Sequence, residues 1–184
     1  MLLITPSNWL AELVKQSFLK DYPVEVINNT IDTEIFKFRK SDFREKHGLE
    51  NKKIVLAVST VWNKKKGLFD YIKLAEMLND EYKLVLIGVP KKIIKKFPEK
   101  ILAFEKTNNA TELAEIYSAS DVFINLTYED NYPTVNLESQ ACGTPCITYR
   151  TGGSPESVPS ENVVEVGDVE GMIKRIYQIC GRDL

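Results

Sequence analysis

The sequence predicts an α/β fold in which a parallel sheet of about six strands carries helices on both faces. Two observations predict it. Short, near-continuously apolar runs rich in β-branched residues recur along the chain, as is typical of strands buried on both faces. Amphipathic helical patterns alternate with these runs through short connections, which indicates right-handed crossovers between parallel strands.

The individual elements follow from this alternation. The first expected strand, "VEVI", and the next, "KIVLAV", are followed by four further apolar runs. In chain order the expected strands are 24–27, 53–58, 83–88, 100–105, 121–126 and 145–149. The helical patterns lie at about 6–19, 40–47, 67–79, 90–97, 110–119, 133–142 and 168–180.

Length and composition set further bounds. A chain of 184 residues is long enough for one compact domain, so we expect a single domain over 1–184. A net charge of −2 gives no general attraction to nucleic acid. No apolar run is long enough to cross a bilayer, and the start lacks the pattern of a secretion signal, which predicts a cytoplasmic protein.

Histidine and cysteine usage excludes several kinds of chemistry. The single histidine, His47, precedes a glycine and fits the last turn of a helix. A Ser-His-Asp triad and a histidine-bearing metal cluster are therefore excluded. The three cysteines, Cys142, Cys146 and Cys180, contain no repeated CxxC and are expected to be reduced and buried.

Ligands of such sheets bind outside the carboxyl ends of the strands, so the site is expected in the segments that follow the apolar runs. One of these segments contains Gly152 and Gly153. This glycine pair permits close approach of the backbone to a ligand, although a turn that requires positive φ explains it equally well. The segments are 28–36, 59–67, 88–90, 106–109, 127–133 and 150–156.

The segment "YEDNYPTVNLESQACGTP" carries the clearest signal. Pro133 suits the first position of a helix, because its φ is fixed at a helical value and it has no N–H to leave unpaired. The free amides of Thr134 and Val135 then point toward the space before the helix, together with the positive end of the helix dipole. This arrangement predicts an anion site.

Glu138 lies five residues after Pro133, roughly 7.5 Å along the helix axis. That is about the distance from a diphosphate to the sugar of its nucleoside, where a carboxylate accepts two hydroxyl hydrogens. Asp130, ahead of the helix, is placed to accept from a second, transferable sugar. The alternative is that Glu138 is a solvated helix residue and that Glu129 and Asp130 only stabilise the helix dipole. The apolar residues around Glu138 favour the first interpretation.

A lysine run opens the helix after the second apolar run, in "WNKKKGLFDYIKLAEML". Lys66 is placed to reach the rim where the anion is expected, with Lys65 or Lys64 as a weaker assistant. A solvated lysine run is the alternative, and this segment by itself favours it.

Taken together, these motifs resemble the C-terminal, donor-binding domain of GT-B glycosyltransferases, closest to the retaining family 4, also called glycosyl transferases group 1. The resemblance implies a Rossmann-like domain and covers nearly the whole chain in order. Its motifs are "TPSNWLAELV", "VEVINNTIDTEIF", "KKKGL", "LVLIG", "ELAEIYSASDVFI", "EDNYPTVNLESQACGTPCI" and "TGGSPESV".

The resemblance implies specific roles for the acidic segment. The family's paired-acid motif falls on Asp130 and Glu138, which are thereby the expected catalytic residues. The first acid and the backbone after it, through Asn131 and Tyr132, meet the donor sugar, and the second acid binds the ribose. The first acid is usually Glu in the family, so Asp130 is a departure. Glu129 lies one residue out of register.

The family's phosphate-binding lysine falls on Lys66. Its companion arginine would fall near Val61 and is absent, so Lys65 or Lys64 would have to substitute for it. The base is commonly held near the loop that contains Lys106 and Thr107. The expected nucleotide-sugar-binding residues are therefore Lys65, Lys66, Thr107, Asn131, Tyr132, Pro133, Thr134, Val135 and Glu138.

The whole resemblance implies the donor half of a retaining glycosyltransferase that needs no metal and no cofactor and takes a UDP-, GDP- or ADP-sugar. The acceptor, a glycan or a lipid-linked sugar, would be held by an N-terminal domain that this chain lacks. Residues Met1 to Ile4 would be the last strand leaving that domain, and the end at Leu184 lacks the usual long returning helix. Bacterial surface polysaccharide synthesis, at the inner face of the membrane, is the expected context, and the fragment by itself is expected to be inactive.

Two alternatives remain open from the sequence. A nucleotide-sugar epimerase of the same two-domain shape would normally bring further acids and a histidine, whereas this chain has only His47. A non-catalytic nucleotide-binding module of the response-regulator kind would need an acidic cluster after the first strand, where "INNTID" supplies only Asp32.

Overall fold

Six parallel strands form the central sheet, in the order β5-β4-β3-β6-β7-β8. The computed structural model describes residues 1–181, so the expectation for the chain end at Leu184 lies outside the described residues. The strands of the central sheet are β3 (Lys53–Val58), β4 (Tyr82–Ile87), β5 (Ile101–Phe104), β6 (Val122–Asn125), β7 (Cys146–Tyr149) and β8 (Val163–Val164).

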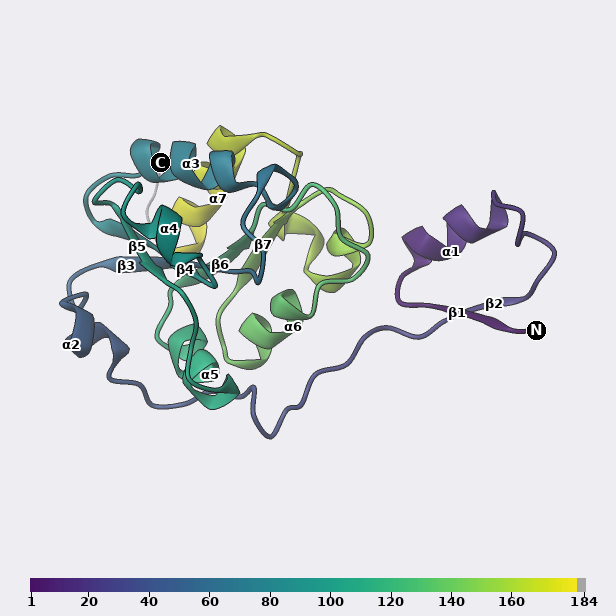
Figure 1. Ribbon diagram of the computed structural model, residues 1–184, viewed down its shortest axis with the longest axis horizontal. Helices are drawn as coiled ribbons and strands as arrows, with labels where there is room; N and C mark the ends of the chain where they lie inside the picture. Colours follow the sequence, from purple (N-terminus) through teal and green to yellow (C-terminus); the bar gives the residue numbers. More distant parts are fainter. Residues whose placement is uncertain (182–184) are drawn as a thin grey trace.

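Helices cover both faces of this sheet, as the alternating pattern predicts (Figure 1). One face packs against α3 (Leu68–Met77) and α7 (Val169–Ile179), with the short α4 (Lys91–Ile94) beside them. The other face packs against α2 (Phe43–His47), α5 (Ala110–Ser118) and α6 (Thr134–Ala141). Three 3₁₀ turns complete this part of the chain: η1 (Lys64–Lys66), η2 (Ser154–Ser157) and η3 (Ser160–Asn162).

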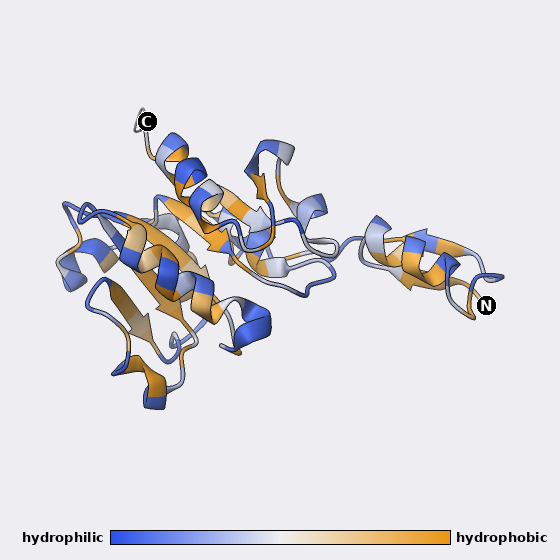
Figure 2. Cartoon of the chain, turned by 90° about the horizontal axis from the view of Figure 1, so that it is seen from above, coloured by the Kyte–Doolittle hydropathy of each residue, from blue (hydrophilic) through white to orange (hydrophobic). Residues whose placement is uncertain are grey.

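The strands form because their side chains are apolar on both faces, and both faces are buried. Val55 of β3 lies between Leu84 of β4 and Val122 of β6 in register, and all three are at most 1% exposed. Figure 2 shows this hydrophobic character along the strands of the central sheet. The predicted α/β sheet is thereby confirmed.

A separate unit precedes the central sheet. It consists of β1 (Leu3–Thr5), α1 (Asn8–Lys15) and β2 (Val24–Val26), and its two strands pair in parallel in a sheet of their own. Figure 1 shows this N-terminal unit apart from the central sheet, joined to it by residues 27–42. The prediction that strand 24–27 joins the main sheet is therefore wrong. The sixth strand is β8, which the sequence pattern does not predict because only two residues form it.

Several local predictions are confirmed with shifted bounds. The first helix is shorter than the 6–19 pattern, and His47 does end α2, where Gly48 follows with a φ of 64°. All three cysteines are free. Cys142 and Cys146 are buried as expected, but Cys180 is only half-buried, because it follows the last turn of α7 at the edge of the core. No helix within residues 1–181 is long and apolar enough to cross a membrane.

Candidate functional site

The strand order reverses between β3 and β6, which lie side by side although two other strands separate them in the chain. From β3 the chain moves outward through β4 and β5, then returns to the opposite side of β3 as β6. In open parallel sheets, ligands bind in the crevice at the carboxyl ends of the strands at such a reversal. The segments that follow β3 and β6 are those with the lysine run and the paired acids.

Lys66 closes the turn that follows β3. The Asn63 side chain accepts a hydrogen bond from the Lys66 amide at 3.0 Å, which fixes the start of η1. Gly67 follows with a φ of 72°, and a Cβ there would lie 2.1 Å from the carbonyl oxygen of Leu126. Only glycine therefore lets the lysine turn lie against the segment after β6.

This close approach places the Lys66 side chain beside the predicted acid, Asp130. Its Nζ lies 2.8 Å from Oδ2 of Asp130 and 3.3 Å from the carbonyl oxygen of Glu129. The side chain of Lys66 is 33% exposed and that of Asp130 is 22% exposed, so the pair is partly shielded from water. The structure thus brings together two residues that the sequence assigned separately to phosphate and to sugar.

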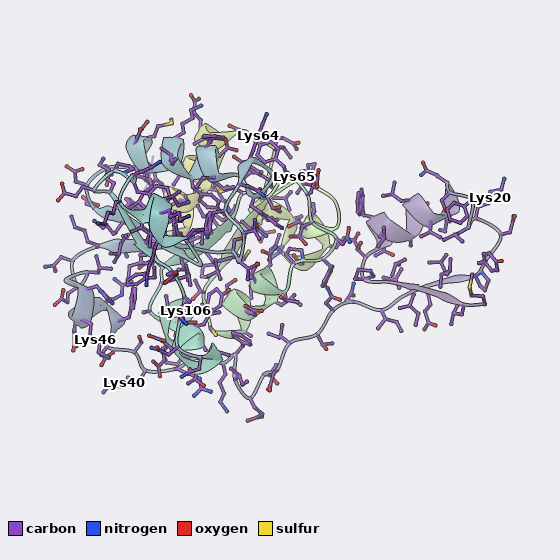
Figure 3. All side chains as sticks on the ribbon, in the orientation of Figure 1. Lys20, Lys40, Lys46, Lys64, Lys65 and Lys106 are labelled. Atoms are coloured by element: carbon purple, nitrogen blue, oxygen red, sulfur yellow. The ribbon has the colours of Figure 1, made fainter. Side chains whose placement is uncertain are left out.

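The neighbouring lysines differ from Lys66 in their surroundings. Lys65 pairs with Glu129 at 2.9 Å, and both side chains are about two-thirds exposed, at 69% and 65%. Because water screens such exposed charges, this ion pair contributes little to the stability of the fold. Lys64 belongs to the same turn, and Figure 3 shows it close to Lys65 at one end of the central unit. Val61, near which the family's arginine would fall, is exposed.

The helix α6 begins one residue later than predicted. Pro133 has a φ of −73° and a ψ of 120°, so it is extended and takes the cap position instead of the first helical one. Its carbonyl oxygen accepts the first hydrogen bond of the helix, from the Asn136 amide at 3.2 Å, as is typical of a cap residue. The prediction for Pro133 was wrong by this one position. The amides of Thr134 and Val135 still open the helix toward the carboxyl end of the sheet.

A hollow of about 380 Å³ lies between these two segments. Of the predicted site residues, Lys66, Asp130, Tyr132, Pro133, Thr134 and Val135 line it together. Asn131 lines an adjoining hollow that also contains Lys66 and Asp130. The structure adds lining residues that sequence reasoning did not assign to the site: Val58, Ser59, Thr60, Tyr71 and Asn125.

Ser59 and Thr60 could have been found, because they directly follow an expected strand in a segment assigned to the rim. Asn125 is the polar end of β6 and donates to the Asn136 side chain at 2.9 Å, inside the protein. Tyr71 lies on α3, where its ring belongs to the core and its hydroxyl bonds the backbone of β6 at 3.1 Å. No sequence signal distinguishes these last two from core residues.

Glu138 is not among the residues that line this hollow. It lies one turn beyond Thr134 on α6, and Oε2 of its carboxylate accepts a hydrogen bond from the Tyr117 hydroxyl at 3.1 Å. Burial raises the pKa of Glu138 above its usual value, although hydrogen bonds from Thr134 and Tyr117 oppose this rise. Glu138 is therefore neither fully solvated nor unpaired.

Lys106 and Thr107 lie apart from Lys66 and Asp130. They line a separate cavity between α2 and α5, together with Phe43, His47 and Phe104. Figure 3 shows Lys106 beside α5, away from Lys64 and Lys65. Whether a base occupies this end of the sheet stays a prediction.

Gly152 and Gly153 let their backbone lie close to the backbone of the acidic segment. A Cβ on Gly152, which has a φ of 52°, would lie 1.9 Å from the carbonyl oxygen of Asp130. A Cβ on Gly153 would lie 1.8 Å from that of Asn131. At Gly152 the close approach and the positive φ occur together, and the approach is to the segment that carries the first acid.

The sequence is similar to those of several known proteins. The chain is 29% identical over 183 residues to N-acetyl-alpha-D-glucosaminyl L-malate synthase of Bacillus anthracis, a match that covers 91% of this chain and 46% of the relative. It is 25% identical to sulfoquinovosyl transferase of Arabidopsis thaliana, over 81% of this chain and 31% of the relative. The chain therefore spans less than half the length of either relative.

Solved structures share the fold. Sucrose-phosphate synthase of Thermosynechococcus elongatus superposes with a TM-score of 0.83 at 20% identity, over 97% of this chain and 49% of that one. The HepE protein of Anabaena, solved in complex with UDP-glucose, superposes with a TM-score of 0.81 at 17% identity, over 98% of this chain and 54% of that one. The family model described as glycosyl transferases group 1 matches residues 39–180. Because this match includes the whole central sheet and both candidate acids, the chain belongs to the glycosyl transferases group 1 family.

Proposed function

We propose that this chain is the donor-binding part of a glycosyltransferase that moves a sugar from a nucleotide-sugar to a glycan or lipid-linked acceptor. The observation that carries the proposal is the Lys66–Asp130 pair at the strand reversal, 2.8 Å apart and beside the start of α6. A cation and two free helix amides at one rim suit a diphosphate. A carboxylate beside them suits the hydroxyls of the sugar that the diphosphate carries.

Each group then has a task. The amides of Thr134 and Val135 and the Lys66 ammonium meet the diphosphate oxygens. Asp130, released from Lys66 as the lysine turns to the phosphate, accepts from the donor sugar. Glu138 accepts from the ribose, and Asn131 and Tyr132 flank the sugar. Thr107 contacts the base, and Lys65 assists at the phosphate once it leaves Glu129.

Positive charge at the leaving diphosphate comes from Lys66 and from the helix dipole, so the proposed transfer is metal-independent and uses no cofactor. Asp130 and Glu138 are the proposed catalytic acids, in the family 4 arrangement and with retention of configuration. The neighbouring HepE structure holds UDP-glucose, which favours UDP among the possible donors.

The acceptor site belongs, in this proposal, to an N-terminal domain beyond the residues of this chain. The chain spans less than half the length of the two curated relatives. The proposed setting is the synthesis of bacterial surface polysaccharide in the cytoplasm, at the inner face of the membrane. The exposed apolar residues of the N-terminal unit support a further domain, because Phe18 is 90% exposed and Ile4 is 60% exposed.

A thermal-shift panel tests the donor proposal. UDP, GDP, ADP, CMP and their sugars are each added to the wild-type chain and to Lys66→Ala. A ligand at 100 times its Kd adds about 2.7 kcal/mol of stability, and each kcal/mol shifts Tm by about 2–4 °C in a chain of this size. We expect a rise for one nucleoside diphosphate family and a smaller rise in the variant. No shift with any nucleotide would contradict the proposed function.

A further inference from the structure

The hydrogen bond between Tyr117 and Glu138 joins α5 to α6 at a residue that the proposed function assigns to the ribose. Tyr117 is fully buried, and Glu138 is half-buried. We propose that Tyr117 is a positioning residue, whose hydroxyl holds the Glu138 carboxylate in the orientation that receives the two ribose hydroxyls. This inference rests on the proposed function and goes beyond it, because Tyr117 itself touches no ligand.

The tyrosine ring is held firmly enough for this task. It makes edge contacts with Phe123 of β6 and with Phe36, at centroid distances of 5.5 and 6.3 Å. The Thr144 hydroxyl bonds the Tyr117 carbonyl oxygen, which ties the end of α5 to the loop after α6. Because the ring is locked, its hydroxyl is a fixed donor at 3.1 Å from Oε2 of Glu138.

The acceptor capacity of the carboxylate fits two further donors. An ionised carboxylate has about four acceptor sites on its two oxygens. Tyr117 and Thr134 occupy two of them from the protein side. The remaining capacity, about two sites, matches the 2′- and 3′-hydroxyls of a ribose. A carboxylate fixed in advance loses less conformational entropy when it binds.

The same contacts favour the ionised form of Glu138, against the effect of burial. Burial raises its pKa, and the hydrogen bonds from Thr134 and Tyr117 lower it again. The titratable and charged groups around this pair are Cys142 at the end of α6, Cys146 on β7 and Arg39 ahead of α2, which interacts with Cys142. Removal of the Tyr117 hydroxyl should therefore raise the pKa of Glu138 further. As the pH is lowered, the variant should then lose ribose binding at a higher pH than wild type does.

A core tyrosine that only needs a partner for its hydroxyl would predict a loss of stability and nothing else. Tyr149→Phe is the matched control for that role. Tyr149 is also fully buried and donates to a carboxylate, Asp70, at 3.0 Å, but it belongs to the opposite face of the sheet. Both variants lose one buried hydroxyl, and only Tyr117→Phe loses the contact with Glu138.

The experiment measures Kd by calorimetry for UDP, GDP and ADP, and then for the 2′,3′-dideoxy form of the one that wild type binds most tightly. The readout is the ratio of the two Kd values, recorded between pH 4 and pH 8. Phosphate ionisation is the same in both ligands and cancels in this ratio. The chain is the full one of 184 residues, as wild type, Tyr117→Phe, Tyr149→Phe and Glu138→Gln.

We expect wild type to prefer the ribonucleotide and Tyr117→Phe to reduce that preference about three- to tenfold, with dideoxy affinity unchanged, since a hydrogen bond to a charged group is lost. The preference in this variant should also weaken at a higher pH than in wild type. Tyr149→Phe should keep the wild-type ratio and pH profile.

The outcomes separate the two ideas. A wild-type ratio and pH profile in Tyr117→Phe, together with a reduced ratio in Glu138→Gln, would overturn the role of Tyr117 and leave the proposed function intact. A wild-type ratio in Glu138→Gln would instead remove Glu138 from the ribose, and the role of Tyr117 with it. A wild-type chain that binds none of the three nucleotides would contradict the proposed function itself.

Discussion

The central sheet buries its apolar side chains, whereas the N-terminal unit leaves several of its own exposed. In the central sheet, helices cover both faces, and side chains such as Val55 and Leu84 are at most 1% exposed. In the N-terminal unit a single helix meets two short strands, and Met1, Ile4 and Phe18 are 72%, 60% and 90% exposed. Burial of apolar surface is the main favourable term in folding. The central sheet therefore gains more stability from its own contacts than the N-terminal unit does.

The two regions are connected by hydrogen bonds and by close packing of Gly153 against Ser7. Glu156 accepts from the backbone amides of Asn8 and Trp9 at 2.8 and 2.7 Å, at the start of α1. Asn29, in the connecting segment, donates to the carbonyl oxygen of Tyr132 at 2.9 Å. The comparison shows that the predicted site residues lie in the region of the central sheet, although Pro6 and Asn29 line the hollow that contains Asn131. The apolar surface of the N-terminal unit stays exposed within residues 1–181.

The largest expected effect concerns catalysis. If the central unit binds the donor and the acceptor is held elsewhere, this chain should show no sugar transfer above background. Orientation of two reactants contributes roughly 7–11 kcal/mol at best, and half of that arrangement would be missing. The measurement uses a labelled nucleotide-sugar and a crude lipid-linked acceptor extract. Slow donor hydrolysis is compatible with this prediction.

The positive control is a full-length family member with its own acceptor, under the same conditions. A transfer rate for this chain near that of the control would contradict the placement of the acceptor site outside it.

The difference in burial predicts a large contrast in stability. Leu84→Ala should lower the free energy of unfolding by about 2–5 kcal/mol, because it opens a cavity in the core of the central sheet. Phe18→Ala is the matched change in the N-terminal unit and should stay within about 0.5 kcal/mol. Urea denaturation followed by circular dichroism gives both values. Equal losses would show that Phe18 is buried in solution, by a contact that the structure does not contain.

Glu138→Gln sharpens the assignment of ligand binding to the central unit. It removes a charged acceptor from two hydroxyls, and such hydrogen bonds contribute about 1.5–3 kcal/mol, so the Kd for the nucleotide-sugar should rise about tenfold or more. Calorimetry measures it. Glu161→Gln, which changes an exposed acid in η3, should leave the Kd unchanged. An unchanged Kd with a lowered Tm in Glu138→Gln would mean that Glu138 is structural.

The smallest effect is expected for Lys66→Ala. The side chain is a third exposed, so solvent screens its charge, and the Kd for a nucleoside diphosphate should rise about fivefold. The Kd for the nucleoside should not change, because it has no phosphate. The difference between wild type and variant should shrink as ionic strength rises. Lys92→Ala, on α4, serves as the control, and equal losses for both ligands would argue against a phosphate role.

Much of the fold was predictable because the signals are local. Alternation of apolar strands with helical patterns indicated the parallel sheet, since burial of both faces requires continuous apolar runs. The position of His47 before Gly48 and the free amides at the start of α6 follow from residues adjacent in sequence. The acids Asp130 and Glu138 were predicted in the same way, because one lies just ahead of the expected helix and the other lies on it.

Other features depend on contacts between distant residues. Apolar character alone did not tell that strand 24–27 pairs with β1, since an apolar strand fits any sheet that buries it. The two-residue β8 is too short for a periodic pattern. Pro133 takes the cap position because its ring fixes only φ, and its ψ of 120° is extended.

The sequence by itself determined the class of fold, and it predicted at which end of the sheet the site lies and which residue types would meet an anion there. The tertiary structure alone decided that Lys66, 64 positions before Asp130, bonds that carboxylate, and that the hydroxyl of Tyr117, 21 positions before Glu138, donates to the Glu138 carboxylate. The physical reason is that periodicity and capping act over one or two helical turns. Which segments meet at the rim depends instead on the order of strands in the sheet, and that order results from packing over the whole chain.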